Sequence, residues 1–182
     1  MKVFIASDHG GFSLKEFLKV RLGKEHEIVD LGCDSEESCD YPDFAEKVAK
    51  AVAESNGKQA HGTALAVGSK EKQAQSTGVA TGSSGKALGI LCCGTGIGMS
   101  LAANKVKGIR AAVVYDEFTA KMARAHNNAN IACLGGRNIE KETALRLAEI
   151  FLATAFEGEK KEGARHLQRV QKIAEIEKKY FK

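Results

Sequence analysis

Continuous apolar runs alternate along this chain with stretches in which apolar residues recur every three or four positions. The runs predict buried strands at residues 2–7, 27–31, 87–92, 109–115 and 130–134. After the first run, Leu14, Phe17, Leu18 and Leu22 recur at helical spacing and end at Gly23. Strands that alternate with helices in this way indicate an α/β fold built on a parallel sheet.

The later helices are predicted by the same spacing. One opens at Asp40-Tyr41-Pro42, because proline is tolerated in a first helical turn. Residues 140–155 form the longest predicted helix. The stretch 163–182 is amphipathic, and we expect this C-terminal helix to pack on its own core or on a second subunit.

Residues 55–86 interrupt the alternation. They are rich in Gly, Ala, Ser, Gln and Thr and contain no aromatic residue. We expect an inserted surface segment here, with a short hairpin built on residues 63–67 and 77–81. A lid or a partner-binding element is the alternative.

Composition narrows the class of protein. A chain of 182 residues, 43% hydrophobic and 27% charged, is expected to form a single globular domain over 1–182. No apolar run approaches the roughly 20 residues of a membrane span, and Asp8 comes too early for a signal peptide, so we expect a cytoplasmic protein that does not bind a membrane. The net charge of +4 is scattered and aromatics are few, which disfavours a nucleic-acid partner.

The five cysteines do not suggest disulfides or a metal. Their number is odd and Cys92 adjoins Cys93, unlike a secreted disulfide framework. None forms a C-x-x-C pair with another, so we expect no metal site.

Residues 91–99, Leu-Cys-Cys-Gly-Thr-Gly-Ile-Gly-Met, carry the most chemical information. A predicted strand precedes this glycine-rich turn and a helix-prone run follows it, so backbone N–H groups and the positive end of a helix face the space above. That space suits a phosphate or a developing negative charge, and the same field favours the thiolate of Cys93. Side chains alternate along a strand, so Cys92 is predicted to be inert core.

Ligands of parallel α/β sheets bind beyond the carboxyl ends of the strands. Asp8, Cys93, Asp116 and Arg137 all follow predicted strands and are expected at that edge.

Seven motifs occur in order: Ser7-Asp8-His9-Gly10-Gly11, Asp40-Tyr41-Pro42, Cys93-Gly94-Thr95-Gly96-Ile97-Gly98, Ala103-Asn104-Lys105, Arg124-Ala125-His126-Asn127, Gly135-Gly136-Arg137 and Gly163-Ala164-Arg165-His166-Leu167-Gln168-Arg169. Together they resemble the ribose-5-phosphate isomerase type B family, which includes galactose- and allose-6-phosphate isomerases. The resemblance covers the chain outside roughly residues 55–86. It implies a three-layer Rossmann-like fold with a five-stranded parallel sheet and no cofactor. It also implies a homodimer, or a dimer of dimers, with the active site between subunits.

Aldose–ketose isomerisation needs a base, and the family carries it either as a cysteine before the glycine turn or as a glutamate after it. Cys93 occupies the first position and Met99 the second, so this chain resembles the cysteine version. Thr95 and the N–H groups of the turn are placed to stabilise an enediolate, as an oxyanion hole does. The residues that supply those N–H groups are Gly94, Gly96, Ile97 and Gly98.

The resemblance also implies roles for residues outside the turn. His126 would act in ring opening with Asn127 on the substrate, and Asp8 would handle a ring or hydroxyl proton. His9 would lie near the phosphate, and Tyr41 would line the same pocket. Arg137, Arg165 and Arg169 resemble the phosphate clamp, and the last two lie four residues apart on one helical face. Lys105, Asp116 and Glu117 are expected to be structural, and Arg110 and Arg146 to be solvated.

Three other classes of protein fit this sequence less well than the family does. A dinucleotide-binding oxidoreductase would have a third glycine where Met99 stands, and it would need a second domain. A cysteine phosphatase would have an arginine six residues after Cys93, at that same methionine. A non-catalytic sugar-phosphate binding module would not need both Cys93 and His126. The length of the sugar stays open: we favour ribose 5-phosphate, with galactose or allose 6-phosphate as the alternative.

Overall fold

The computed structural model describes residues 1–63 and 86–181 of the chain. Five strands form one sheet: β1 (Lys2–Ser7), β2 (Glu27–Asp30), β3 (Leu88–Cys93), β4 (Ala111–Val113) and β5 (Ile131–Gly135). The helices are α1 (Phe12–Leu22), α2 (Tyr41–Thr63), α3 (Ile97–Ala103), α4 (Glu117–Ala125), α5 (Lys141–Ala153) and α6 (Ala164–Tyr180). Three short 3₁₀ turns are η1 (His9–Gly11), η2 (Glu157–Glu159) and η3 (Lys161–Gly163).

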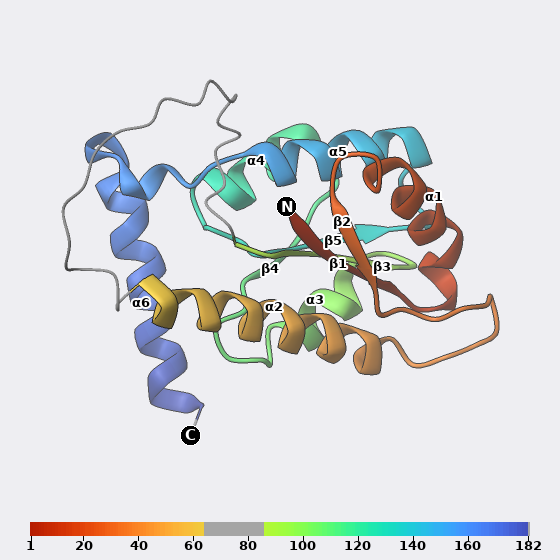
Figure 1. Cartoon of the computed structure of the whole chain (residues 1–182), viewed down its shortest axis with the longest axis horizontal. Helices are drawn as coiled ribbons and strands as arrows, with labels where there is room; N and C mark the ends of the chain where they lie inside the picture. Colours follow the sequence, from red (N-terminus) through yellow and green to blue (C-terminus); the bar gives the residue numbers. More distant parts are fainter. Residues whose placement is uncertain (64–85, 182) are drawn as a thin grey trace.

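The strand order is β2-β1-β3-β5-β4, and every neighbouring pair is parallel. Apolar residues of α1, α4 and α5 pack on one face of the sheet, and those of α2 and α3 pack on the other. Figure 1 shows these two groups of helices on opposite sides of the strands. The three-layer, five-stranded Rossmann-like fold is therefore confirmed. None of the helices within residues 1–63 and 86–181 is long and apolar enough to cross a membrane.

Two expectations about the helices were wrong. Helix α2 continues to Thr63, so residues 55–63 belong to this helix rather than to a separate segment that follows it. The extension is tied to the sheet because the Asn56 amide donates to Ala87 O (3.2 Å) and accepts from Ala87 N–H (3.0 Å). Helix α5 has 13 residues and is shorter than α2, with 23, and α6, with 17. The rest of the expected insertion and hairpin, residues 64–85, lies outside the described residues.

A buried lysine fixes the loop that follows β2. Lys15, on α1, is 2% exposed and donates hydrogen bonds to Asp30 Oδ2 and Cys33 O, both at 2.8 Å. Asp30 also accepts from Lys19 Nζ (2.9 Å) and from Gly32 N–H (3.0 Å). Burial by itself raises the pKa of Asp30, but these hydrogen bonds outweigh it and hold that pKa below its usual value.

We expect Lys15→Met to lower the free energy of unfolding by about 2 kcal/mol, because Asp30 then loses its buried partner. A depressed carboxyl pKa stabilises the fold above the unfolded pKa, and that stability is lost as the pH falls through the folded value. The variant should therefore lose less stability on acidification below about pH 4 than the wild type. Denaturant unfolding at pH 7 and pH 3.5 measures both effects. Lys2→Met, which breaks only the exposed pair with Glu27, is the control.

Candidate active site

The loops that follow β1, β3 and β5 meet at the carboxyl edge of the sheet. Cys93 ends β3 opposite Gly135 of β5, and its carbonyl accepts a hydrogen bond from Gly136 N–H at 2.7 Å. Arg137 N–H donates to Gly94 O at 3.1 Å, and Asp8 N–H donates to Cys92 O at 3.3 Å. The parallel register thus places Asp8, Cys93 and Arg137 in neighbouring loops, as the sequence predicts.

The Arg137 side chain lies across two glycines. A β-carbon at Gly10 would stand 3.3 Å from Arg137 Nη2 and 3.4 Å from Asp8 Oδ1. One at Gly94 would stand 3.3 Å from Arg137 Cδ. Because both positions lack a side chain, the guanidinium can approach the backbone of the turn and the carboxylate of Asp8. A positive group therefore borders the turn on the side of η1.

Cys93 is 4% exposed, and its sulfur accepts a hydrogen bond from Gly96 N–H at 3.1 Å. A backbone donor aimed at sulfur stabilises the thiolate, which is the form able to take a proton. Ile97 N–H donates to Thr95 Oγ1 at 3.3 Å, and Thr95 itself is exposed. Two N–H groups of the predicted oxyanion hole therefore point to partners within the turn.

Cys92 is turned to the other face of the sheet. It belongs to the core cluster that contains Leu14 and Phe151, whereas Cys93 packs in the cluster that contains Met99. Complete burial raises the pKa of the Cys92 thiol far above its ordinary value. Cys92 is thus a neutral core residue on the other face of the sheet from Cys93, as predicted.

His9 and Tyr41 border the same edge. His9 Nδ1 lies 3.3 Å from both the backbone N and the backbone O of Cys39 in the loop that follows β2. The Tyr41 ring, at the start of α2, lies against Gly98 in the first turn of α3. One chain thus gathers the following predicted residues along this edge: Asp8, His9, Tyr41, Cys93, Gly94, Thr95, Gly96, Ile97, Gly98 and Arg137.

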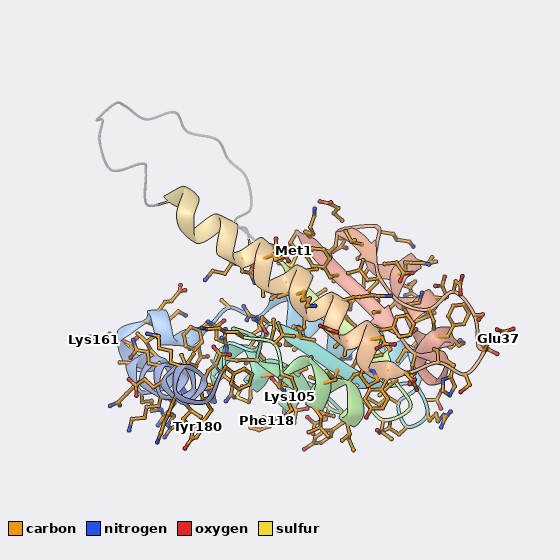
Figure 2. All side chains as sticks on the ribbon, turned by 90° about the horizontal axis from the view of Figure 1, so that it is seen from below. Met1, Glu37, Lys105, Phe118, Lys161 and Tyr180 are labelled. Atoms are coloured by element: carbon orange, nitrogen blue, oxygen red, sulfur yellow. The ribbon has the colours of Figure 1, made fainter. Side chains whose placement is uncertain are left out.

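The other predicted residues lie at the opposite end of the sheet. Helix α4 follows β4 and returns toward the strand starts, so His126, its C-terminal cap, lies away from Cys93. Figure 1 shows α6, which carries Arg165 and Arg169, at the end toward which α2 runs. In Figure 2, Lys161 and Tyr180 mark this end and Glu37, in the loop after β2, marks the other. A single chain therefore holds two separate groups of predicted site residues.

The second group is centred on a pair of histidines. The rings of His126 and His166 are stacked, with centroids 4.0 Å apart and planes 12° from parallel. Glu157 Oε2 lies 3.6 Å from His126 Nε2, and Arg165 Nε lies 3.4 Å from His166 Nε2. Burial lowers the pKa of His166, and His126 with the nearby arginines lowers it further. The sequence motifs do not contain Glu157, because it lies in a short 3₁₀ turn that leaves no periodic signal.

His126, Glu157 and His166 could be read as metal ligands, since their ligand atoms lie within 4.8 Å of one another. A metal ion lies in the plane of each imidazole that binds it, and two parallel stacked rings share no such plane. Arg165 also adds positive charge beside His166. The geometry does not fit a metal, and we assign none here.

Asn127, the neighbour of His126, lies at a cavity rather than at the histidine pair. It lines a cavity of about 370 Å³ between the start of β4 and α6. Asn104, Arg110, Ile173, Ile176 and Phe181 also line this cavity.

Arg110 was expected to be solvated, and this was wrong. Its Nε donates to Asn128 O at 2.9 Å, and burial lowers its pKa. Arg146 instead forms an exposed ion pair with Glu117 at 2.7 Å, and Asp116 caps α4 by accepting from Thr119 N–H at 2.7 Å. These acidic residues are structural, as predicted.

Comparison with known proteins gives one consistent result. The family model described as Ribose/Galactose Isomerase matches residues 3–68 and 71–173, and so extends into a segment where the sequence motifs show no resemblance. Ribose-5-phosphate isomerase B of Escherichia coli is 35% identical over 179 residues, which cover 98% of this chain and 97% of that protein.

Solved structures agree over the same length. Ribose-5-phosphate isomerase B of Clostridium thermocellum superposes with a TM-score of 0.77 at 41% identity and covers 99% of both chains. The Mycoplasma genitalium enzyme, solved with bound ribulose-5-phosphate, has a TM-score of 0.76 at 38% identity, over 97% of this chain and 96% of that one. The fold, the order of the motifs and the family match agree, and the chain belongs to the ribose/galactose isomerase family.

Proposed function

We propose that this protein interconverts ribose 5-phosphate and ribulose 5-phosphate through an enediolate, with Cys93 as the base. The observation that carries the proposal is the Gly96 N–H bond to Cys93 Sγ at the carboxyl end of β3, beside Arg137. It places a sulfur that accepts a backbone hydrogen bond in the same turn that the Arg137 side chain borders. The Mycoplasma relative with bound ribulose-5-phosphate supports this choice of substrate.

The proton transfer follows from the chemistry of the two sugars. Cys93 removes the C2 proton of the open-chain aldose, the C–H electron pair forms the C1–C2 double bond, and the carbonyl pair moves to O1. The thiol then returns the proton to C1, while the C2 hydroxyl becomes the ketone and its proton passes to the negative O1. Thr95 and the N–H groups of Gly94 and Gly98 stabilise the negative oxygens, whereas those of Gly96 and Ile97 donate within the turn. A base of this kind contributes roughly 10²–10⁴-fold to the rate.

Ring opening and phosphate binding fall to residues from both groups. His126 and Asp8 add a proton to the ring oxygen and remove one from the anomeric hydroxyl, and Asn127 binds the substrate. Arg137, Arg165 and Arg169 bind the phosphate through charge-assisted hydrogen bonds. No step in this sequence requires a redox cofactor, because the hydrogen leaves one carbon and returns to its neighbour.

The separation of the two groups supports an active site shared between subunits. Cys93 and Arg137 of one chain would face His126, Arg165 and Arg169 of a second copy. A candidate contact surface lies on α3 and at the start of α4, where Leu101 is 61% and Phe118 is 71% exposed, with Ile97 and Tyr115 also exposed. Phe118 is labelled on the lower face in Figure 2. Apolar side chains gathered in this way mark protein–protein contacts, and a homodimer, or a dimer of dimers, would cover them.

Parallel assays on ribose 5-phosphate, galactose 6-phosphate and allose 6-phosphate test the substrate. We expect kcat/KM for the five-carbon sugar to be at least about tenfold higher, since one extra carbon is worth that much in a fitted pocket. A preference for a six-carbon sugar would keep the isomerase and change its substrate. Thermal stabilisation by NAD, with none by ribose 5-phosphate, would favour the dinucleotide-binding alternative instead.

A further inference from the structure

We propose that Glu157 is a positioning residue for His126: its carboxylate pairs with Nε2 of the imidazole and holds the ring in place against His166. The inference rests on the proposed role of His126 in ring opening. It adds a residue that none of the seven sequence motifs contains, and three different elements supply the three side chains: α4, η2 and α6.

Glu157 is held in position by the chain around it. It opens η2 directly after the buried Phe156, and Lys160 N–H donates to its carbonyl at 3.0 Å. Gly163, at the start of α6, is so close that a β-carbon there would overlap the Glu157 carbonyl. The acid is therefore fixed to the helix that carries His166.

His126 is fixed from the other side. It caps α4 through its N–H bond to Met122 O at 3.0 Å. The following turn contains Asn128 at φ 48°, whose side-chain oxygen accepts from Arg124 Nη1 at 2.9 Å. Arg110 binds the carbonyl of the same residue. Hydrogen bonds thus hold the backbone on both sides of His126. The side-chain torsions of the histidine are then its main remaining degrees of freedom.

Glu157 and the stacked ring of His166 restrain those torsions. The charged groups near the pair are Glu157 on η2 and Arg165 and Arg169 on α6, so Glu157 supplies the negative charge among them. Its 3.6 Å approach to His126 Nε2 is longer than a formed hydrogen bond. Catalytic hydrogen bonds are often long without substrate and shorten in the complex. A protonated His126 would draw the carboxylate closer.

The test compares Glu157→Ala with Glu159→Ala. Both variants remove one negative charge from the same turn, but Glu159 is exposed and takes no part in the histidine pair. We expect Glu157→Ala to lower kcat on ribose 5-phosphate about tenfold with little change in KM, because binding does not use this acid. Glu159→Ala should match the wild type, and Glu157→Gln, which keeps an acceptor, should recover part of the loss.

A spectroscopic readout separates positioning from general structure. Stacking on His166 shifts the ring-proton NMR signals of His126, and Glu157→Ala should move these signals toward those of an unstacked histidine. Exchange of the C1 proton of ribulose 5-phosphate with D₂O should persist, because that open-chain substrate needs only the Cys93 step.

The two proposals fail in different ways. If His126→Asn retains full turnover, the ring-opening role is wrong, whatever Glu157 does. If His126→Asn is impaired while Glu157→Ala matches Glu159→Ala in both kcat and NMR signals, only the positioning role is overturned.

Discussion

Cys93→Ala is expected to lower isomerisation by roughly 10²–10⁴-fold, whereas Cys92→Ala should keep most of the activity. Both residues are buried thiols at the end of β3, but they lie in different core clusters on the two faces of the sheet. The sulfur of Cys93 accepts from Gly96 N–H, while burial keeps Cys92 protonated by raising its pKa. Steady-state assay of the two variants on ribose 5-phosphate measures the difference.

The pair also provides its own control for folding. Cys92→Ala leaves a small cavity in the core and should lower the melting temperature, so retained activity in that variant would show that core damage alone does not stop catalysis. Solvent exchange at C1 of ribulose 5-phosphate should disappear in Cys93→Ala, because no other group takes that proton. Equal activity in the two alanine variants would contradict the assignment of Cys93 as the base.

Much of the fold could be predicted because β3, β5 and most of β1 are buried and appear as apolar runs. The extent of α2 could not, since residues 55–63 lack an apolar periodicity and contain two glycines. What holds part of this stretch is a long-range pair of hydrogen bonds between Asn56 and Ala87. Helix propensity does not report such a contact.

The part of the candidate site that follows directly from the order and direction of the strands could be predicted. Asp8, Cys93 and Arg137 each follow a strand, and the strands of a parallel sheet end at one edge. The environment of Arg110 depends instead on a left-handed turn at Asn128, 18 residues away in the chain. Glu157 belongs to turns fixed by the close approach of Gly163. Neither arrangement leaves a local pattern in the sequence.

The group around Cys93 and the group around His126 lie at opposite ends of the sheet, which predicts that inactive variants of the two groups restore activity when they are mixed. Two inactive variants, Cys93→Ala and His126→Asn, should recover roughly a quarter of the wild-type activity when unfolded together in equal amounts and refolded. In a shared site, the cysteine comes from one chain and the histidine from another. A random mixture supplies each intact residue half of the time, and both of them about a quarter of the time. This fraction is the same for a dimer and for a dimer of dimers.

A second mixture gives a different expected activity for shared sites than for sites within single chains. The double variant Cys93→Ala/His126→Asn, refolded with an equal amount of wild type, should also give about a quarter of the activity if sites are shared. Sites contained within single chains would give about one half in this mixture and no recovery in the first. That second pattern would show that the two groups meet by a rearrangement within one chain, and the shared site would be wrong. Recovery in the first mixture would place His126, and with it Glu157, in the partner's half of each active site.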